Sequence, residues 1–114
     1  MSAVHYMPMR SVDRYIFDAV LSGRKKVETR ASGPKYQNIK KGDIIEFRCG
    51  KDKFQKTVGQ LRKFKTIARL LKKYSLKNIA PWLSSVKELE KLVMGFPGYP
   101  ERIKKHGLIA FELK

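Results

Sequence analysis

A single glycine, Gly23, separates a segment with helical periodicity from one with strand alternation, and this junction constrains the fold more than any other feature. The apolar residues of 12–22 recur at the i, i+3, i+4, i+7, i+8 spacing of an amphipathic helix, and they are Val12, Tyr15, Ile16, Ala19 and Val20. Ser11 is placed to cap this helix, and Gly23 is placed to take the left-handed conformation that commonly ends one. A strand over 25–31 follows directly, so the domain must pack a helix against a sheet.

Glu28 and Arg30 stand two residues apart in this strand and therefore point to the same face. In so basic a chain the carboxylate is the more telling member of the pair, and we expect both to line a pocket. The alternative is a surface ion-pair network, which would contribute little stability. Lys25 would face away from Glu28 in a regular strand, so their convergence requires a bulge, or requires Lys25 to precede the strand.

The remaining elements alternate between strand and helix patterns. The sequence predicts a strand over 4–9, at an edge of the sheet because it contains Pro8, and a hairpin of strands 43–49 and 54–61. A helix from Thr66 to Tyr74, a helical turn at 76–81 and a helix opened by the capping box Ser85 to Glu88 come next. After a break at 95–100 and a last helical turn, an apolar strand over 108–113 is expected in the middle of the sheet. This order indicates a single α+β domain over 1–114, or a small barrel.

The charge balance points to an anionic partner. The 114 residues carry 26 Lys and Arg against 10 acids, a formal charge of +16. The chain has few Gln and Asn and many Lys, which favours a heat-adapted source. Heat adaptation usually increases Lys and Glu together, however, and acids are few here, so an anionic partner explains the excess of positive charge better. The candidate contacts for a nucleic-acid backbone are Lys51, Lys53, Lys56, Arg62, Lys63, Lys65, Arg69, Lys72 and Lys73, with Asp52 as the one acid among them.

Other classes of protein lack support in the sequence. No apolar run is long enough to span a membrane, and residues 1–10 lack the apolar core of a secretory signal. The lone cysteine, Cys49, cannot form an internal disulfide and is expected to be buried, and His5 and His106 stand at opposite ends of the chain. We therefore expect a cytoplasmic monomer with no metal site and no cofactor.

Several aromatic residues are candidates for stacking on unpaired bases, which is how single-stranded RNA is commonly read. Tyr36 in a Gly-Pro loop and Trp82 after Pro81 are the preferred ones, with Tyr99 as a third, while Phe54 and Phe64 fit a core. Trp82 alternatively closes one end of the barrel. Asp43 after Gly42 either shapes the cleft or serves its own turn, since Asp readily bonds nearby backbone.

Four segments together resemble the ASCH domain family in content and order: Gly23-x-Lys25-x-x-Glu28-x-Arg30, Lys41-Gly42-Asp43, 84–89 and 107–113. The resemblance is to a small, stand-alone, archaeal member. It implies a PUA-like fold, a small β-barrel of mixed, largely antiparallel strands with helices packed around it. It also implies a cleft for RNA or a modified nucleoside, for which we assign Lys25, Glu28, Arg30, Tyr36, Asp43 and Trp82.

The resemblance bears on catalysis as well. One branch of the family hydrolyses N4-acetylcytidine with a Lys, a Thr three residues later and a separate Glu. Lys25 matches the first, but Glu28 stands at the Thr position, and 81–83 contain no carboxylate. We therefore expect an RNA-binding module. The alternative is a hydrolase acting on a nucleoside or RNA, an amidohydrolase or a metal-independent nuclease, that uses Lys25.

Overall fold

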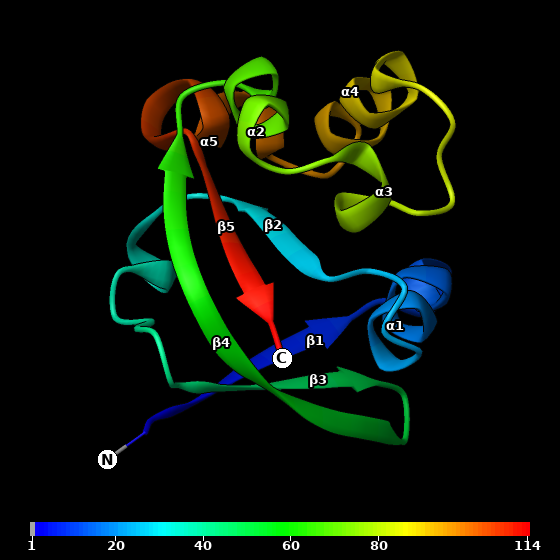
Figure 1. Ribbon diagram of the computed structural model, residues 1–114, viewed down its shortest axis with the longest axis vertical. Helices are drawn as coiled ribbons and strands as arrows, with labels where there is room; N and C mark the ends of the chain where they lie inside the picture. Colours follow the sequence, from blue (N-terminus) through cyan, green and yellow to red (C-terminus); the bar gives the residue numbers. More distant parts are fainter. Residues whose placement is uncertain (1) are drawn as a thin grey trace.

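The computed structural model describes residues 2–114. One mixed 5-stranded sheet, in the order β1-β3-β4-β5-β2, curls into half a barrel (Figure 1). Its strands are β1 (Val4–Met9), β2 (Val27–Ala31), β3 (Ile44–Cys49), β4 (Asp52–Phe64) and β5 (Leu108–Leu113). β1 pairs with β3 in parallel, and the other pairs are antiparallel. The predicted α+β fold is confirmed, with β1 at an edge and β5 inside the sheet.

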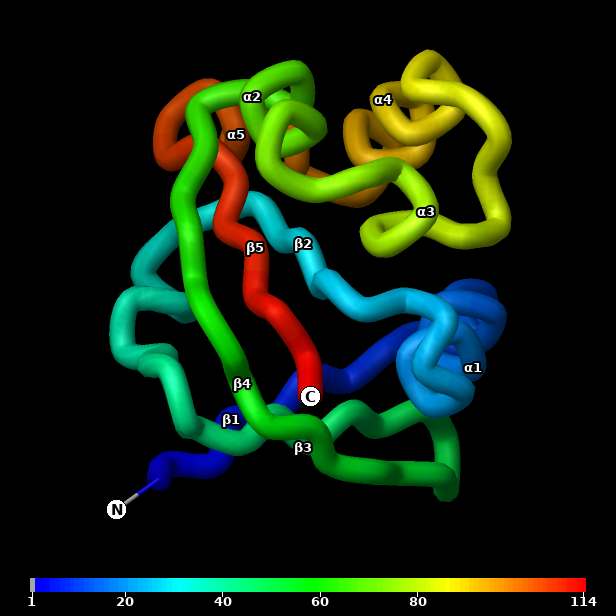
Figure 2. Tube along the Cα trace, viewed as in Figure 1, coloured from blue at the N-terminus to red at the C-terminus, as the bar shows by residue number. Residues whose placement is uncertain are grey.

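The long strand β4 produces the curl. Its first half pairs with β3 and its second half pairs with β5, and the register shifts between Val58 and Leu61. Such an irregularity bends a strand and increases its twist, which turns one half of the sheet over the other. The predicted hairpin is confirmed, but β4 continues three residues beyond the predicted end because β5, distant in sequence, supplies a partner for it (Figure 2).

Within residues 2–114 five helices pack around the sheet, with α2 to α5 at one end and α1 beside the β1–β3 part (Figure 1). They are α1 (Arg14–Leu21), α2 (Ile67–Lys73), α3 (Leu76–Ile79), α4 (Val86–Met94) and α5 (Tyr99–His106). The predicted cap at Ser85 is confirmed, since its side chain accepts from the Glu88 N–H at 3.2 Å, and Thr66 opens α2 as predicted by accepting from the Arg69 N–H at 3.2 Å. None of the helices within residues 2–114 has the length and apolar character to cross a bilayer.

The start of α1 differs from the prediction. Residues 11–13 form a 3₁₀ turn, the helix begins at Arg14, and Ser11 makes no capping bond. A 3₁₀ turn has three residues per turn, so it shifts the phase of the preceding apolar positions. Val12 is consequently 70% exposed, whereas Phe17 is buried. The predicted end is confirmed, because Gly23 has a left-handed φ of 82°.

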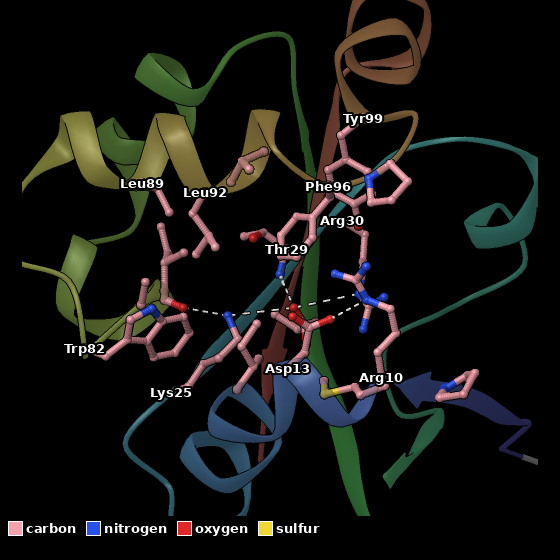
Figure 3. Close-up of a pocket in the computed structure, with 18 residues that line it drawn as sticks. Arg10, Asp13, Lys25, Thr29, Arg30, Trp82, Leu89, Leu92, Phe96 and Tyr99 are labelled. Atoms are coloured by element: carbon pink, nitrogen blue, oxygen red, sulfur yellow. Dashed lines mark hydrogen bonds and ion pairs between the residues drawn. The ribbon is translucent and has the colours of Figure 1, made fainter. Parts of the chain in front are cut away.

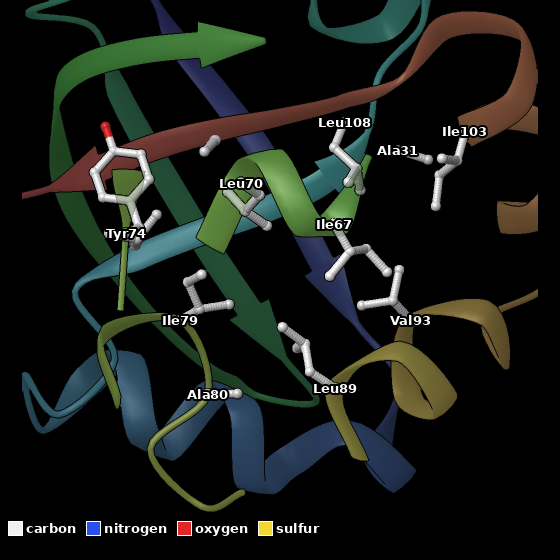
Figure 4. Close-up of a cluster of buried hydrophobic side chains, with 12 residues drawn as sticks. Ala31, Ile67, Leu70, Tyr74, Ile79, Ala80, Leu89, Val93, Ile103 and Leu108 are labelled. Carbon is white, nitrogen blue, oxygen red and sulfur yellow. The ribbon is translucent and has the colours of Figure 1, made fainter. Parts of the chain in front are cut away.

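Two apolar clusters hold the layers together. The first joins β2 and β5 to the helices and includes Ile67, Leu70, Leu89 and Val93 (Figure 4). The second fills the inside of the curl, where buried Phe47 stacks against Phe54 with ring centroids 5.3 Å apart; Phe17, Phe111 and Cys49 belong to it as well. The core assignments of Phe54 and Cys49 are thereby confirmed.

Asp43 belongs to the turn before β3. Its carboxylate accepts from the backbone N–H groups of Lys40 and Ala3 at 3.0 and 3.2 Å, and it contacts His5 Nε2 at 2.8 Å. The residue therefore ties the start of β1 to the start of β3. Of the two roles considered for Asp43, the structure shows the second, in which the carboxylate bonds the backbone of its own turn.

This arrangement predicts a pH dependence of stability. The hydrogen bond with His5, followed by the one from Lys40, lowers the pKa of Asp43 below its ordinary value of 3.8. A carboxyl with a lowered folded-state pKa stabilises above the unfolded pKa, and this contribution is lost as pH falls through the folded-state value. We expect Asp43→Asn to reduce stability at neutral pH and to flatten the decline below about pH 4. Urea midpoints between pH 2.5 and 7, at about half-unit steps, measure this; an unchanged acid slope would contradict it.

Candidate functional site

A cavity of about 220 Å³ lies where the half-barrel stays open, between the end of β1 and the edge strand β2 (Figure 3). Residues from α1, from the turn after α3, from α4 and from the start of α5 complete its wall. Among those that line it are Lys25, Glu28, Arg30, Trp82, Phe96 and Tyr99. The sequence motif of β2 therefore faces this partly open cavity.

Two charged side chains bond the open edge of β2. In an antiparallel ladder alternate residues turn their backbone groups away from the partner strand, and an edge strand leaves these groups unpaired. Lys25 Nζ donates to the Val27 carbonyl at 2.8 Å and also to the carbonyl of Ile79, the last residue of α3. Glu28 Oε1 accepts from the Thr29 N–H at 3.0 Å. Lys25 and Glu28 thus make the bonds that a neighbouring strand would otherwise supply.

Lys25 precedes β2, which is one of the two geometries that its convergence with Glu28 required. Its side chain is 3% exposed, and its Nζ lies 3.7 Å from Glu28 Oε1. Burial lowers the pKa of Lys25; the charge of Glu28 opposes this and Arg30 adds to it. The ammonium group donates to two carbonyls and lies within ion-pair distance of one carboxylate, so its principal contacts are within the fold.

The carboxylate of Glu28 is only half satisfied. Oε1 has the Thr29 bond and lies near both cations, with Arg30 Nε at 3.8 Å. Oε2 is buried and has no hydrogen-bond partner among the described residues. A buried polar atom without a partner costs about 1–3 kcal/mol, and more when it is charged. The site therefore holds one strong acceptor for which the described residues supply no donor.

Arg30 supplies a lasting positive charge beside this acceptor. Burial tends to lower the pKa of Arg30, but Glu28, and then Tyr99 and Tyr36, more than offset it, and the pKa is raised. Its side chain remains 19% exposed. A guanidinium in this position can donate to a carbonyl or a phosphate oxygen.

Aromatic rings form opposite ends of the cavity (Figure 3). At one end Trp82 meets Tyr15 edge-on at 5.1 Å, and Lys25 Nζ lies 5.9 Å from the indole centroid. At the other end the Phe96 and Tyr99 rings are 5.1 Å apart. Flat, apolar walls around a small polar group suit a planar ring system.

The structure gathers some of the predicted site residues and separates others. Lys25, Glu28, Arg30 and Trp82 line one cavity, as does Tyr99. Tyr36 is buried in the core, 6.0 Å from the Phe111 ring, and neither it nor Asp43 lines the cavity. The residues that sequence reasoning missed include Phe96, Leu89, Leu92 and the ion pair Arg10–Asp13. The sequence signal for Phe96 was its position beside Tyr99 in the predicted break at 95–100.

The residues predicted to contact a nucleic-acid backbone fall into two groups. Five of them line a shallow groove where β4 runs into α2: Lys63, Lys65, Arg69, Lys72 and Lys73. Lys51, Lys53 and Lys56 belong to the β3–β4 hairpin, and Arg62 donates to Gln60 on β4. Within residues 2–114, no three His, Cys, Asp or Glu side chains are grouped so as to hold a metal ion.

Comparisons with known proteins agree with this architecture. The ASCH domain model matches residues 11–114. The crystal structure of the hypothetical protein PH0355 superposes with a TM-score of 0.82 at 32% identity, over 97% of each chain. The solution structure of protein PF0455 from Pyrococcus furiosus gives 0.77 at 27% identity, over 97% of this chain and 96% of that one. No curated protein matches the sequence.

Proposed function

This chain belongs to the ASCH domain family, and from that premise we propose that it is an RNA-binding module whose cavity receives one unpaired base or nucleoside. The observation that carries the proposal is the buried Oε2 of Glu28, a residue that lines the cavity, which has no hydrogen-bond partner among the described residues. An exocyclic amine or a ring N–H of a base would supply the missing donor. Arg30, 3.8 Å from the same carboxylate, would donate to a neighbouring acceptor of that base.

The dimensions of the cavity support a single ring system. Pockets for drug-sized ligands span about 300–1,000 Å³, and this cavity of about 220 Å³ is smaller. One base fits between the aromatic ends, and a stacked pair does not. Bases are accessible in this way in single strands, loops and bulges, whereas duplex stacking hides their faces. The proposal therefore favours unpaired RNA over duplex DNA.

The charges near the cavity are consistent with a nucleotide. Lys25 and Arg30 face one carboxylate, Glu28, and Arg10 at the rim is matched by Asp13 at 2.9 Å. One positive charge is thus in excess where a base enters, and it would favour the phosphate that accompanies the base. The chain's formal charge of +16 adds sequence-independent affinity.

Glu28→Gln tests the proposal. The amide oxygen can keep the Thr29 bond, while the NH₂ group replaces the free acceptor by a donor. We expect binding of single-stranded RNA to weaken by about 10- to 100-fold and the preference over duplex DNA to fall, with an unchanged salt slope, because one charge-assisted hydrogen bond contributes about 1.5–3 kcal/mol. Fluorescence anisotropy of labelled single-stranded RNA, structured RNA and duplex DNA across a salt series measures this.

Glu46→Gln is the matched control. Glu46 is also buried, but its carboxylate is bonded to Arg48 and Gln55, and it does not line the cavity. This variant should bind as the parent does. Equal affinity and equal preference for RNA in the parent and the Glu28→Gln variant would show that the cavity does not read the ligand.

One observation favours a second candidate, a nucleoside- or RNA-directed hydrolase. Burial lowers the pKa of Lys25 beside a carboxylate, as a catalytic amine requires. Its bonds to the Val27 and Ile79 carbonyls count against a free nucleophile. Acylated nucleosides and single-stranded RNA incubated with the parent protein should stay unchanged by mass spectrometry. Turnover that disappears in Lys25→Arg would favour the hydrolase instead.

A further inference from the structure

The groove between the end of β4 and α2 has a built arrangement of cations. Lys63 and Lys65 flank Phe64 where the strand ends, and the Thr66 cap then fixes the direction of α2. Arg69, Lys72 and Lys73 follow the i, i+3, i+4 spacing of one helix face, while Ile67 and Leu70 are buried on the other. Five positive side chains therefore line one shallow, open groove.

These groove cations have no close counter-charge among the described residues. The groove is lined only by the five cations and Phe64, and in the part of the chain that the structure describes none of the five lies within ion-pair distance of an acid. The hairpin cations Lys51, Lys53 and Lys56 make no ion pair within residues 2–114 either, but acids stand closer to them. Asp52 lies between Lys51 and Lys53 in sequence, and the pKa of Glu46 is lowered by Arg48 foremost and by Lys53 as well. The repulsion among the groove cations is thus left for a partner to relieve.

The groove is separate from the cavity. The two share no lining residue. The inner face of α2 packs on α4 through the helical core, and residues of α4, among them Leu89 and Val93, reach the cavity wall (Figure 4). A layer of packed side chains therefore stands between the two sites.

We propose that this groove is a second RNA contact, which holds several successive phosphates of a single strand and is independent of the cavity. The choice of RNA as partner rests on the proposed function; the groove as a polyanion site rests on its own charge. A single phosphate is satisfied by two or three cations, whereas five cations spread along an open groove match a chain of phosphates. The cavity supplies the preference for a base, and the groove supplies the salt-dependent affinity.

Two triple variants with the same loss of charge test the proposal. Lys65→Gln, Arg69→Gln and Lys72→Gln remove three groove cations, and Lys51→Gln, Lys53→Gln and Lys56→Gln remove three hairpin cations. Each phosphate contact contributes about 0.7 to the slope of log affinity against log salt for single strands. In the groove variant this slope should be smaller by about 2. At about 0.1 M salt, where the Debye length is about 10 Å, the variant should bind RNA at least tenfold more weakly than the parent. The hairpin variant should keep the parent slope.

The outcomes separate this inference from the proposed function. Equal losses in the two triple variants, or no loss in the groove variant, would overturn the groove as a specific site. Binding of polyglutamate that competes with RNA and also depends on the groove would overturn RNA as its partner in favour of an acidic polypeptide. A groove-dependent slope with no effect of Glu28→Gln would support the groove and reject the base-reading cavity. Because the altered side chains are mostly exposed, thermal unfolding should be close to that of the parent.

Discussion

Alanine at position 107 is expected to destabilise the fold by about 3 kcal/mol, because backbone strain at such a site alone costs about 1–3 kcal/mol and a clash adds to it. Gly107 joins α5 to β5 with φ 76° and ψ −160°, a conformation that is essentially restricted to glycine. A Cβ there would stand 2.5 Å from the Phe64 carbonyl oxygen. The alanine would therefore push β5 away from the end of β4, where Leu108 pairs with Phe64.

Gly42→Ala is the control for this prediction. Gly42 has a similar positive φ of 91°, but an added Cβ would meet no atom within 4 Å. This substitution should cost only the conformational strain, about 1–2 kcal/mol. In thermal unfolding Gly107→Ala should lower Tm by about 10 °C or more and Gly42→Ala by clearly less. Equal shifts would mean that β4 moves freely and that the contact at Phe64 does not constrain the fold.

Those parts of the fold that depend on local patterns were predictable. Thr66 and Ser85 cap their helices because capping involves only residues within one turn. β5 was placed inside the sheet because it is apolar on both faces, and β1 at an edge because Pro8 lacks an N–H. The extension of β4 could not be predicted, since its partner β5 follows more than forty residues later.

The candidate site was predictable only in its charged part. The alternation in β2 and the family pattern identified Glu28, Arg30 and Lys25, and the structure resolves the position of Lys25, which precedes the strand. The apolar walls were not identified, because Leu89 and Leu92 follow the helical period of a core face and cavity walls share that pattern. Tyr36 looked like an exposed loop aromatic, but its 3₁₀ turn folds it into the core.

One set of side chains serves stability and recognition together. Lys25 and Glu28 bond the open edge of β2, and the same arrangement leaves Glu28 Oε2 without a hydrogen-bond partner among residues 2–114. The edge of the sheet is thereby protected from pairing with another chain. A substitution in this pair should therefore alter stability as well as binding, and binding data on such variants need stability data beside them.

Lys25→Met is expected to cost about 3–5 kcal/mol, the usual range when one partner of a buried ion pair is removed. It would leave the Val27 and Ile79 carbonyls without their donor and Glu28 with only Arg30 as a nearby cation. Lys26→Met, next in sequence at an exposed position, should change stability by less than about 0.5 kcal/mol. Urea unfolding at neutral pH measures both variants.

The double variant Lys25→Met, Glu28→Met tests whether the two residues act as a unit. Replacing both members of a buried pair by apolar side chains is often far less costly than replacing one. Here the Thr29 N–H and the two carbonyls would still lose their partners, so recovery should be partial. We expect the double variant to be about 1–3 kcal/mol more stable than the sum of the single losses predicts. Strict additivity would show that Lys25 and Glu28 stabilise the edge of β2 independently, and the 3.7 Å contact between them would then contribute nothing to the fold.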